Sequence, residues 1–484
     1  MIQTRLATAF RAPAWMLLED KVHHAQCTNA TTATATTSRG DVFEVSFCVD
    51  NPPAISYLCV HSPTLTAADF TAAPSVACSS EDLLLLLMPM AFSGMFSGRV
   101  DKEYFMYKAG SGTQSPSLRR IPTHDPRYNR GEDIGIIRCG DHGQFFLAAL
   151  LFTSCNIHEF TLHLYSSASD QWTMKSVPLD PSCNLDRVDS EYQPALPHKT
   201  IQLGGSLLGW VDLWKGILIC DVLADHPVVR FVRLPELMPG NYHHESPHMI
   251  RDVHCTGGVI KFIEMEQFLI PTVVPTQEPT QGRRRPGEEA NILYDWDLEP
   301  PCKEDAPDPD IWLKSFVGWR TVIWDRMVYG ICWNKVCKAS YDEIMVPDPS
   351  HYEMLSELGD GSAGNLVLMN LSTDSPTLSI GGDNVVHMSS TVKLDHGRSV
   401  MMALNLQRKT VEALALYGPE RKTCHPYRPC TLSKYLKISP GSFRDWKVND
   451  LPRAISKPVP QPISMRPWRT DLGGNRHQRR AAPY

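Results

Sequence analysis

The chain lacks the short motifs by which most nucleotide-binding and hydrolytic enzymes are recognised. It has no P-loop lysine motif, no G-x-G-x-x-G, no G-x-S-x-G elbow, no H-E-x-x-H and no C-x-x-C pair. No apolar run reaches the ~18 residues that a membrane span needs. The sequence therefore points to no catalytic residue, no cofactor-binding residue and no metal ligand, and we expect no membrane association.

Helix signals and charge bias are also scarce. The best helix signal is the capping-box spacing from Ser350 to Glu353, ended by Gly359, which predicts a helix of about two turns. With so few helices, a Rossmann-like sheet of alternating strands and helices is not expected. The net charge of −6 argues against a broad nucleic-acid-binding surface, which normally leaves a basic excess.

The 14 cysteines are scattered and follow no secretory signal. Several lie in apolar runs, as Cys220 does in ILIC, where a thiol behaves as a small apolar side chain. We expect reduced, mostly buried thiols, no structural disulfide, and a location in the cytoplasm, the nucleus or both. The alternative is an organelle transit peptide, because the first 18 residues contain Arg5 and Arg11 but no acid.

What the chain does have is many short strands separated by turns. Residues 198–235 hold four apolar runs, two glycine-containing breaks and a His-Pro turn, the pattern of a four-stranded antiparallel propeller blade. Residues 160–177 and 400–417 repeat its strand–turn–strand unit. Further strands are expected at Val42–Val49, Ile55–Val60, Leu83–Met88, Tyr104–Lys108, Ile134–Arg138, Gln144–Phe152, Val253–Thr256, Val259–Met265, Trp312–Val317, Arg320–Trp324, Val328–Trp333, Asn365–Asn370, Thr377–Ile380 and Val385–Ser389.

At four strands per blade, these segments predict an all-β, propeller-like fold of about six blades with few short helices. We expect an N-terminal segment at 1–14, the propeller at 15–420, a C-terminal extension at 421–455 and a disordered Arg/Pro-rich tail at 456–484. Residues 275–310 carry a basic triplet followed by acids and prolines, which predicts a disordered surface insertion.

Several clusters have the residue types of metal sites. A structural zinc site needs paired short spacings that none of them supplies, and the acidic cluster lacks the glycine and glutamate of a calcium loop. We therefore interpret them as solvated loop residues, with a propeller mouth as the alternative for the three loop histidines. The clusters are Cys424, His425 and Cys430; His23, His24 and Cys27; His243, His244 and His248; and Asp305, Asp308 and Asp310.

The arginine clusters and the tryptophans of the sequence each allow two structural or functional interpretations. The arginines are either solvated charge runs, which we prefer, or nuclear-import and phosphate-contacting patches. The tryptophans are expected to wedge between blades, and a recognition surface is their alternative. These groups are Arg283, Arg284 and Arg285; Arg476, Arg479 and Arg480; and Trp210, Trp214, Trp319, Trp324 and Trp333. Cys332 and Cys337 are expected on opposite faces of one strand, where they do not pair.

Several segments resemble the plant domain of unknown function 1618 (DUF1618) family. They are GGSLLGWVDLWKGILICDVLADHPVVRFVRLPEL, RDVHCTGGVIKFIEME, FVGWRTVIWDR, SPTLSIGGDNVVHMSS and the N-terminal WMLLED, and the resemblance covers about residues 15–420. It implies an intracellular plant protein with a propeller-like body similar to F-box-associated and kelch-like domains. It carries over no activity, cofactor or site residue. Too few residues precede the first expected strand for an F-box, so no ubiquitin-ligase adaptor role is expected.

Three functions follow from a propeller without catalytic motifs. The leading hypothesis is a non-enzymatic scaffold that binds protein partners through loops on its faces. The second is an enzyme or small-ligand binder using the central channel, which would show converging polar groups with shifted pKa values. The third is weak nucleic-acid association through the basic loop and tail, which the net charge opposes.

Overall fold

The strands form because apolar and polar residues alternate along them. In β4 (Val42–Cys48), the side chains of Phe43, Val45 and Phe47 are buried while Val42 is exposed. Two-residue periodicity of this kind places one face of a sheet against the core. The computed structural model describes residues 12–91, 100–122, 134–139, 143–153, 156–182, 197–242, 244, 246–273, 312–358, 368, 371–381, 384–392, 399–417 and 427–437. All of them belong to the unit Met1–Arg444.

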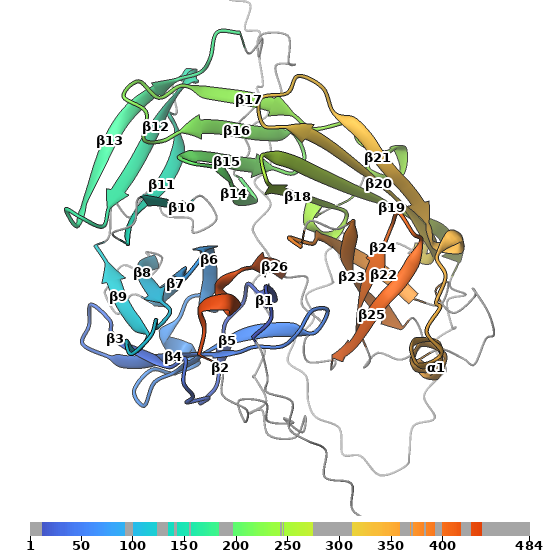
Figure 1. Cartoon of the computed structure of the whole chain (residues 1–484), viewed down its shortest axis with the longest axis horizontal. Coiled ribbons are helices and arrows are strands. Elements are labelled where there is room, and N and C mark those ends of the chain that lie inside the picture. The colour runs from blue at the N-terminus through green and yellow to red at the C-terminus, as the bar shows by residue number, and fades with distance from the viewer. Residues whose placement is uncertain are drawn as a thin grey trace, which may run out of the picture. The chain divides into compact units, whose positions relative to one another are not determined.

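The described strands make a six-bladed β-propeller (Figure 1). Five blades are four-stranded antiparallel sheets in which sequence neighbours pair. Blade 2 contains β6 (Ser75–Ser80), β7 (Leu83–Ala91), β8 (Val100–Lys108) and β9 (Ser117–Ile121). Blade 3 contains β10 (Ile134–Cys139), β11 (Gln144–Thr153), β12 (Asn156–Ser166) and β13 (Gln171–Pro178). Blade 4 contains β14 (Lys199–Gly204), β15 (Leu207–Asp212), β16 (Gly216–Asp221) and β17 (Val229–Arg233).

The last two four-stranded blades follow the same order. Blade 5 contains β18 (Arg251–Thr256), β19 (Val259–Val273), β20 (Trp312–Met327) and β21 (Asn334–Ser340). Blade 6 contains β22 (Leu371–Leu378), β23 (Val385–Val392), β24 (Ser399–Asn405) and β25 (Thr410–Tyr417). The predicted blade at 198–235 and the predicted hairpin at 400–417 are confirmed, and so is the all-β propeller itself.

Blade 1 is built differently, because both ends of the described chain contribute to it. Its strand order is β26 (Tyr427–Cys430), β1 (Met16–Glu19), β5 (Ile55–His61), β4 and β3 (Ala33–Thr36), and β2 (His23–His24) also pairs with β5. β26 and β1 are antiparallel, with Met16 opposite Cys430. The ring is thus closed by a strand from within residues 421–455, which the residue pattern assigns to a C-terminal extension.

Apolar layers between successive blades hold the ring together. The layer between blades 5 and 6 contains Trp319 and Ile323 from β20 with Val386 and Met402 from β23 and β24, all nearly inaccessible to solvent. The layer between blades 6 and 1 is smaller, and its described buried members are Leu17, Ile55, Met401 and Tyr427. Burial of such layers is the main favourable term for a fold of this kind.

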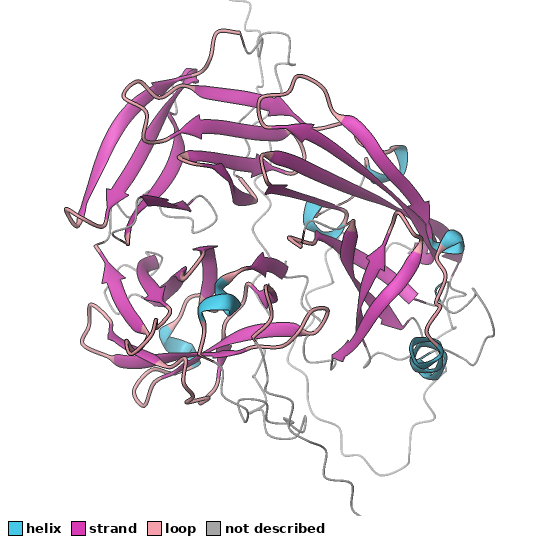
Figure 2. Ribbon diagram, in the orientation of Figure 1, coloured by secondary structure: helices cyan, strands magenta, loops and turns pink. Residues whose placement is uncertain are grey.

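Helices are few in the described part of the chain (Figure 2). The one α-helix there, α1 (Pro349–Leu358), buries Leu355 beside blade 6. Short 3-10 turns lie at Ala67–Asp69, Pro239–Asn241, Pro247–Met249, Tyr341–Glu343 and Leu432–Tyr435. Asp348 caps α1 rather than Ser350, because the Asp348 carboxylate accepts the Ser350 N–H at 2.8 Å. No helix in the described ranges is long and apolar enough to span a membrane.

Two strand predictions in blade 5 are wrong in detail. Trp312–Val317 and Arg320–Trp324 are one strand, β20, in which a bulge opposite Phe268 and Leu269 changes the register. Val328–Trp333 is the turn between β20 and β21, so Cys332 and Cys337 do not share a strand. Of Asn365–Asn370, only Leu368 is among the described residues.

Candidate functional site

The first strand of each four-stranded blade faces the axis of the propeller, together with β26. A cavity of about 360 Å³ there is lined by residues from β6, β10, β14, β18 and β26, and by Ile380 just beyond β22. A second cavity of about 430 Å³ lies against the turns after β6, β14 and β18, with Glu81, Gly205 and Gly257 among its lining residues. The axis of the propeller is therefore hollow and polar along part of its length.

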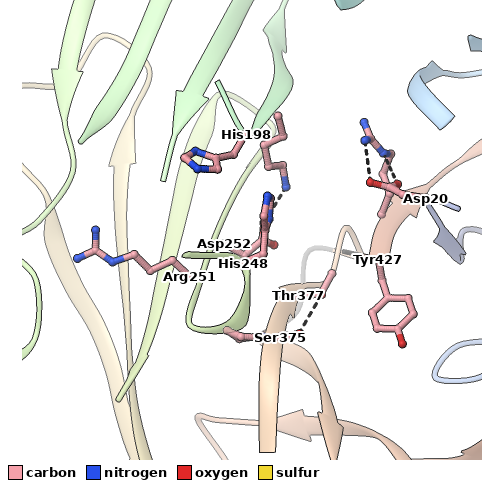
Figure 3. Close-up of a pocket in the computed structure, with 11 residues that line it drawn as sticks. Asp20, His198, His248, Arg251, Asp252, Ser375, Thr377 and Tyr427 are labelled. Atoms are coloured by element: carbon pink, nitrogen blue, oxygen red, sulfur yellow. Dashed lines mark hydrogen bonds and ion pairs between the residues drawn. The ribbon is translucent and has the colours of Figure 1, made fainter. Parts of the chain in front are cut away.

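A small charged recess adjoins these cavities (Figure 3). Its volume of about 30 Å³ leaves room for one or two waters. Its lining residues come from four inner strands and their ends: Asp20, His198, Lys199, His248, Arg251, Asp252, Ser375, Pro376, Thr377, Tyr427 and Arg428.

Asp252 joins three blades in this recess. One carboxylate oxygen lies 2.7 Å from the Lys199 Nζ of blade 4, and the other accepts the Leu378 N–H of blade 6 at 2.9 Å. Both oxygens thus have a donor, and the ammonium group has a counter-ion. This carboxylate therefore holds inner strands together.

Arg428 has a similar role on the other side of the recess. Its guanidinium donates two hydrogen bonds to the Asp20 carboxylate, at 2.8 and 3.0 Å, and a third to the Ala77 carbonyl at 3.0 Å. Burial lowers the pKa of Arg428, but the attraction and hydrogen bonds of Asp20, with smaller effects of Cys78 and Cys430, together raise it by more. The pair connects β26 and the end of β1 with β6, where the ring closes.

Three imidazoles complete the channel wall. His198 and His248 meet edge to face with ring centroids 5.4 Å apart, and His254 lines the cavity of about 360 Å³. Burial lowers the pKa of His248 and of His254 to about 4 each, helped by His198 and Lys199 for His248 and by Lys199 and Lys261 for His254. Burial also lowers the pKa of His198. The Leu213 N–H donates to His198 Nδ1 at 3.2 Å, so the proton of this neutral ring is on Nε2.

One carboxyl group beside the recess titrates close to neutral pH. Asp374 precedes Ser375 in β22, and burial raises its pKa to about 6. The phenols of Tyr417 and Tyr427 lie near enough for the Asp374 charge to raise their own pKa values further. This group and the three histidines are the titratable groups of shifted pKa that the second functional hypothesis requires.

A different kind of surface lies at the outer edge of blades 4 and 5. We define the rim turn as Met327–Trp333, which is the last residue of β20 and the turn that leads to β21. Within it, Met327 is 58%, Tyr329 74% and Ile331 92% exposed. Val328 is buried, and its N–H donates to the Gly258 carbonyl at 3.0 Å, which fixes the base of the turn.

Two arginines lie beneath these exposed side chains. The Arg230 guanidinium of β17 is 5.3 Å from the centre of the Tyr329 ring, and that of Arg326 is 5.5 Å from the centre of the Trp333 ring. Burial, followed by repulsion from Arg230, lowers the pKa of Arg326. No ion pair of the described residues involves either arginine.

The structure confirms some of the predictions made for individual residues and contradicts others. Trp210 and Trp319 are buried core residues, as predicted. The solvated-loop interpretation is wrong for His248, because it packs against His198 in the channel recess. His244 is half-buried, with Nδ1 3.1 Å from the Ser246 carbonyl. Trp214, Trp324 and Trp333 are partly buried, and the last two pack on Phe262.

The predicted clusters at the chain ends do not assemble as proposed. His23 contacts Glu19 and His24 packs on Phe70, whereas Cys27 meets two other cysteines, Cys48 and Cys59. Cys430 is buried in β26. Several candidates lie outside the described residues: Cys424, His425, His243, Asp305, Asp308, Asp310, the arginines at 283–285 and 476–480, the 275–310 insertion and the 456–484 tail.

The channel residues themselves went unrecognised in the sequence. Asp20, Lys199 and Asp252 are ordinary charged residues in segments far apart along the chain, and no motif links them. Their shared property is position, since each lies at the start or end of a strand near the axis. These residues could have been found by identifying the innermost strand of each blade from the sequence and listing the charged residues at its ends.

The family comparison bears on blades 4 to 6. The model of the family described as protein of unknown function (DUF1618) matches residues 210–387. This part of the chain, blades 4 to 6, is similar to the DUF1618 family. The DUF1618 match includes Asp252 and Thr377 of the recess and the whole rim turn, but its description assigns no function to any of them.

Comparison with solved structures adds only distant similarities. A Bombyx mori GH32 beta-fructofuranosidase in complex with sucrose is 11% identical with a TM-score of 0.24, covering 70% of this chain and 63% of that chain. The same Bombyx mori enzyme in a second structure is 10% identical with a TM-score of 0.24, covering 71% and 59%. This chain thus spans about three fifths of the length of those enzymes. No curated protein matches the sequence.

Proposed function

We propose that this protein is a non-enzymatic scaffold that binds a protein partner through the rim turn. The observation that carries the proposal is the exposure of Tyr329 and Ile331, at 74% and 92%, on a turn whose base is fixed by buried Val328. Large apolar side chains held in water on an ordered base are typical of recognition surfaces. Tyrosine and arginine are also the residue types enriched where protein interfaces have their strongest contacts.

The charges around the turn indicate the chemistry of the partner. Arg230 and Arg326 are close enough for the first to lower the pKa of the second, and neither has a carboxylate partner among the described ion pairs. A carboxylate brought by a partner would relieve this repulsion. The proposed partner segment therefore combines an apolar anchor, which packs on Ile331 and Tyr329, with an Asp or Glu.

The test is affinity capture from an extract of the source organism with the full chain and two variants. Ile331→Asp places a charge at the centre of the proposed surface and should reduce specific capture of the partner about tenfold or more. Met174→Asp is the matched control, because Met174 is also exposed, at 63%, on β13 of blade 3. Equal capture by the wild-type chain and Ile331→Asp would overturn the proposal.

A second candidate function is small-ligand binding in the axial cavity. It is favoured by His254, which lines the cavity of about 360 Å³ together with Lys199, and by His198 and His248 in the adjoining recess, which Lys199 also lines. Such a wall suits a polar or anionic ligand of small size. Its ion pairs already engage Asp20 and Asp252, so an enzymatic role would need a base other than these two carboxylates.

Calorimetric titration of the full chain with inorganic phosphate and with a dicarboxylate tests this candidate. Binding by the wild-type chain that His254→Gln weakens would support it, and heats no larger than dilution for both probes would contradict it. Nucleic-acid association stays a prediction for residues outside the described ranges. If found, it should weaken steeply with salt.

A further inference from the structure

Three thiols converge on the face of blade 1 that lies opposite its apolar layer with blade 2. Cys48 in β4 pairs with Tyr57, and Cys59 in the antiparallel β5 pairs with Ser46, so the two cysteines are diagonal neighbours on one face. Phe47 and Leu58 occupy the opposite face, in the core. Cys59 is 2% and Cys48 8% exposed.

The third thiol comes from the loop that crosses this face. Cys27 lies in residues 25–32, whose backbone and side chains bind the sheet independently of sulfur. The Ala25 N–H donates to the Val60 carbonyl at 3.1 Å, and Asn29 Nδ2 donates to the Phe47 carbonyl at 3.0 Å. This attachment brings the Cys27 and Cys48 sulfurs to 3.0 Å, and all three sulfurs lie within 4.8 Å of one another.

We propose that Cys27, Cys48 and Cys59 form a thiolate site for a zinc ion. Zinc binds thiolates at about 2.3 Å, and tetrahedral geometry then separates the sulfurs by about 3.8 Å. The Cys27–Cys48 separation is 3.0 Å and no sulfur pair is more than 4.8 Å apart, so a small adjustment of the side chains brings the three sulfurs to this spacing. A pair of thiols suffices for a disulfide, whereas a third buried thiol at the same distance is what a metal site requires.

The coordination chemistry follows from the ligand set. Each thiol loses its proton to solvent as the S–H bond is replaced by a Zn–S bond, so one Zn²⁺ releases three protons and leaves a site of net charge −1. Among the His, Cys, Asp and Glu side chains of the described residues, these three alone come together in this way. The fourth position is therefore assigned to water. Half-exposed Cys27 leaves a route for the ion.

The apo thiols should bind the metal with a strong pH dependence. All three must be deprotonated together on binding, so zinc affinity should rise steeply with pH. The bound ion would hold the 25–32 loop on the sheet and stabilise the blade in which the ring closes.

The experiment measures metal on the full chain purified with reductant and zinc. Elemental analysis should find zinc retained by wild type and by Cys220→Ser, which removes a buried cysteine of blade 4. Cys27→Ser and Cys59→Ser should each lower zinc affinity by at least about tenfold, since ligands matter no less than the outer-shell partners for which losses of this size are typical. Cobalt in place of zinc should give a thiolate-to-cobalt charge-transfer band that Cys27→Ser removes.

Two results would overturn the proposal. One is zinc retention by Cys27→Ser equal to that of the wild type, which would place the metal on other residues. The other is a Cys27–Cys48 disulfide in peptide mapping of protein isolated without reductant, together with no zinc uptake after reduction. Because Cys27 is half-exposed, its serine variant should fold, and near-ultraviolet circular dichroism of the same sample checks this.

Discussion

The channel recess and the rim turn place polar and apolar groups in opposite ways. In the recess, Asp252 and Arg428 are withdrawn from water, and each has its hydrogen-bond partners within the protein. In the rim turn, Tyr329 and Ile331 are exposed to water and the arginines beside them lack counter-ions among the described ion pairs. The paired charges of the recess have their counter-ions within the protein, whereas the two rim-turn arginines have none among the described ion pairs.

This difference separates stability from recognition. When one member of a pair that binds across blades is removed, the free energy of unfolding of the protein falls, because the other member is left without a partner. Exposed apolar groups contribute little to folding, so their removal should affect only what the protein binds. The two regions should therefore respond in opposite ways to substitution.

The largest effect is expected at the ring closure. Arg428→Met leaves the Asp20 carboxylate without its two hydrogen bonds, and we expect unfolding free energy to fall by about 3 kcal/mol. Arg408→Met, at an arginine whose side chain is 74% exposed, should change it by less than about 0.5 kcal/mol. Urea denaturation of both variants measures this, and equal losses would show that the recess does not hold the ring together.

The next effect depends on pH. His248 and His254 have pKa values of about 4 in the folded protein, against the ordinary histidine value of 6.5, so the unfolded chain binds more protons between these limits. Stability should therefore fall as pH falls from about 6.5 to about 4, by roughly 2 kcal/mol for each imidazole after allowance for partial exposure.

Thermal melts across this range measure the slope. The double substitution His248→Gln with His254→Gln should flatten it, while His226→Gln, at an exposed histidine of the β16–β17 turn, should not. An unchanged slope in the double variant would mean that other groups determine acid stability. Asp374 acts in the opposite direction, because its raised pKa of about 6 favours the folded state at low pH.

The smallest effect on stability is expected at the rim turn. Tyr329→Ala and Ile331→Asp should change the free energy of unfolding by less than about 0.5 kcal/mol, because both side chains are largely in water. Denaturation midpoints measured alongside the capture experiment check that any loss of binding is not a loss of folding. A destabilisation of more than about 2 kcal/mol would show that the turn is structural.

The sequence predicted the blades because each one is a local pattern. The 198–235 blade is contiguous, its turns are marked by glycine and His-Pro, and its apolar runs alternate, so pairing of sequence neighbours follows directly. The closure of blade 1 could not be predicted in this way. The pairing of Met16 with Cys430 joins the two ends of the described chain, and no local pattern specifies a partner at that separation.

The sites were harder to predict for the same reason. The turn at Val328–Trp333 is apolar enough to resemble a strand, and only the β20–β21 pairing shows that its side chains point into water. Cys27, Cys48 and Cys59 lack the short paired spacings of zinc motifs, because sheet register and a crossing loop bring them together. The position of both the rim turn and the three cysteines thus depends on strand pairing between segments that are separated in the sequence.

The most direct test of the contrast is site-specific photo-crosslinking in an extract of the source organism. A photoreactive residue at position 331 should give a discrete adduct with a protein partner, and the same residue at position 174 should not. Arg230→Glu should abolish the adduct, because it replaces the charge beneath Tyr329 that is proposed to meet a carboxylate. No adduct from position 331, or the same adduct from both positions, would contradict the assignment of the rim turn as the binding surface.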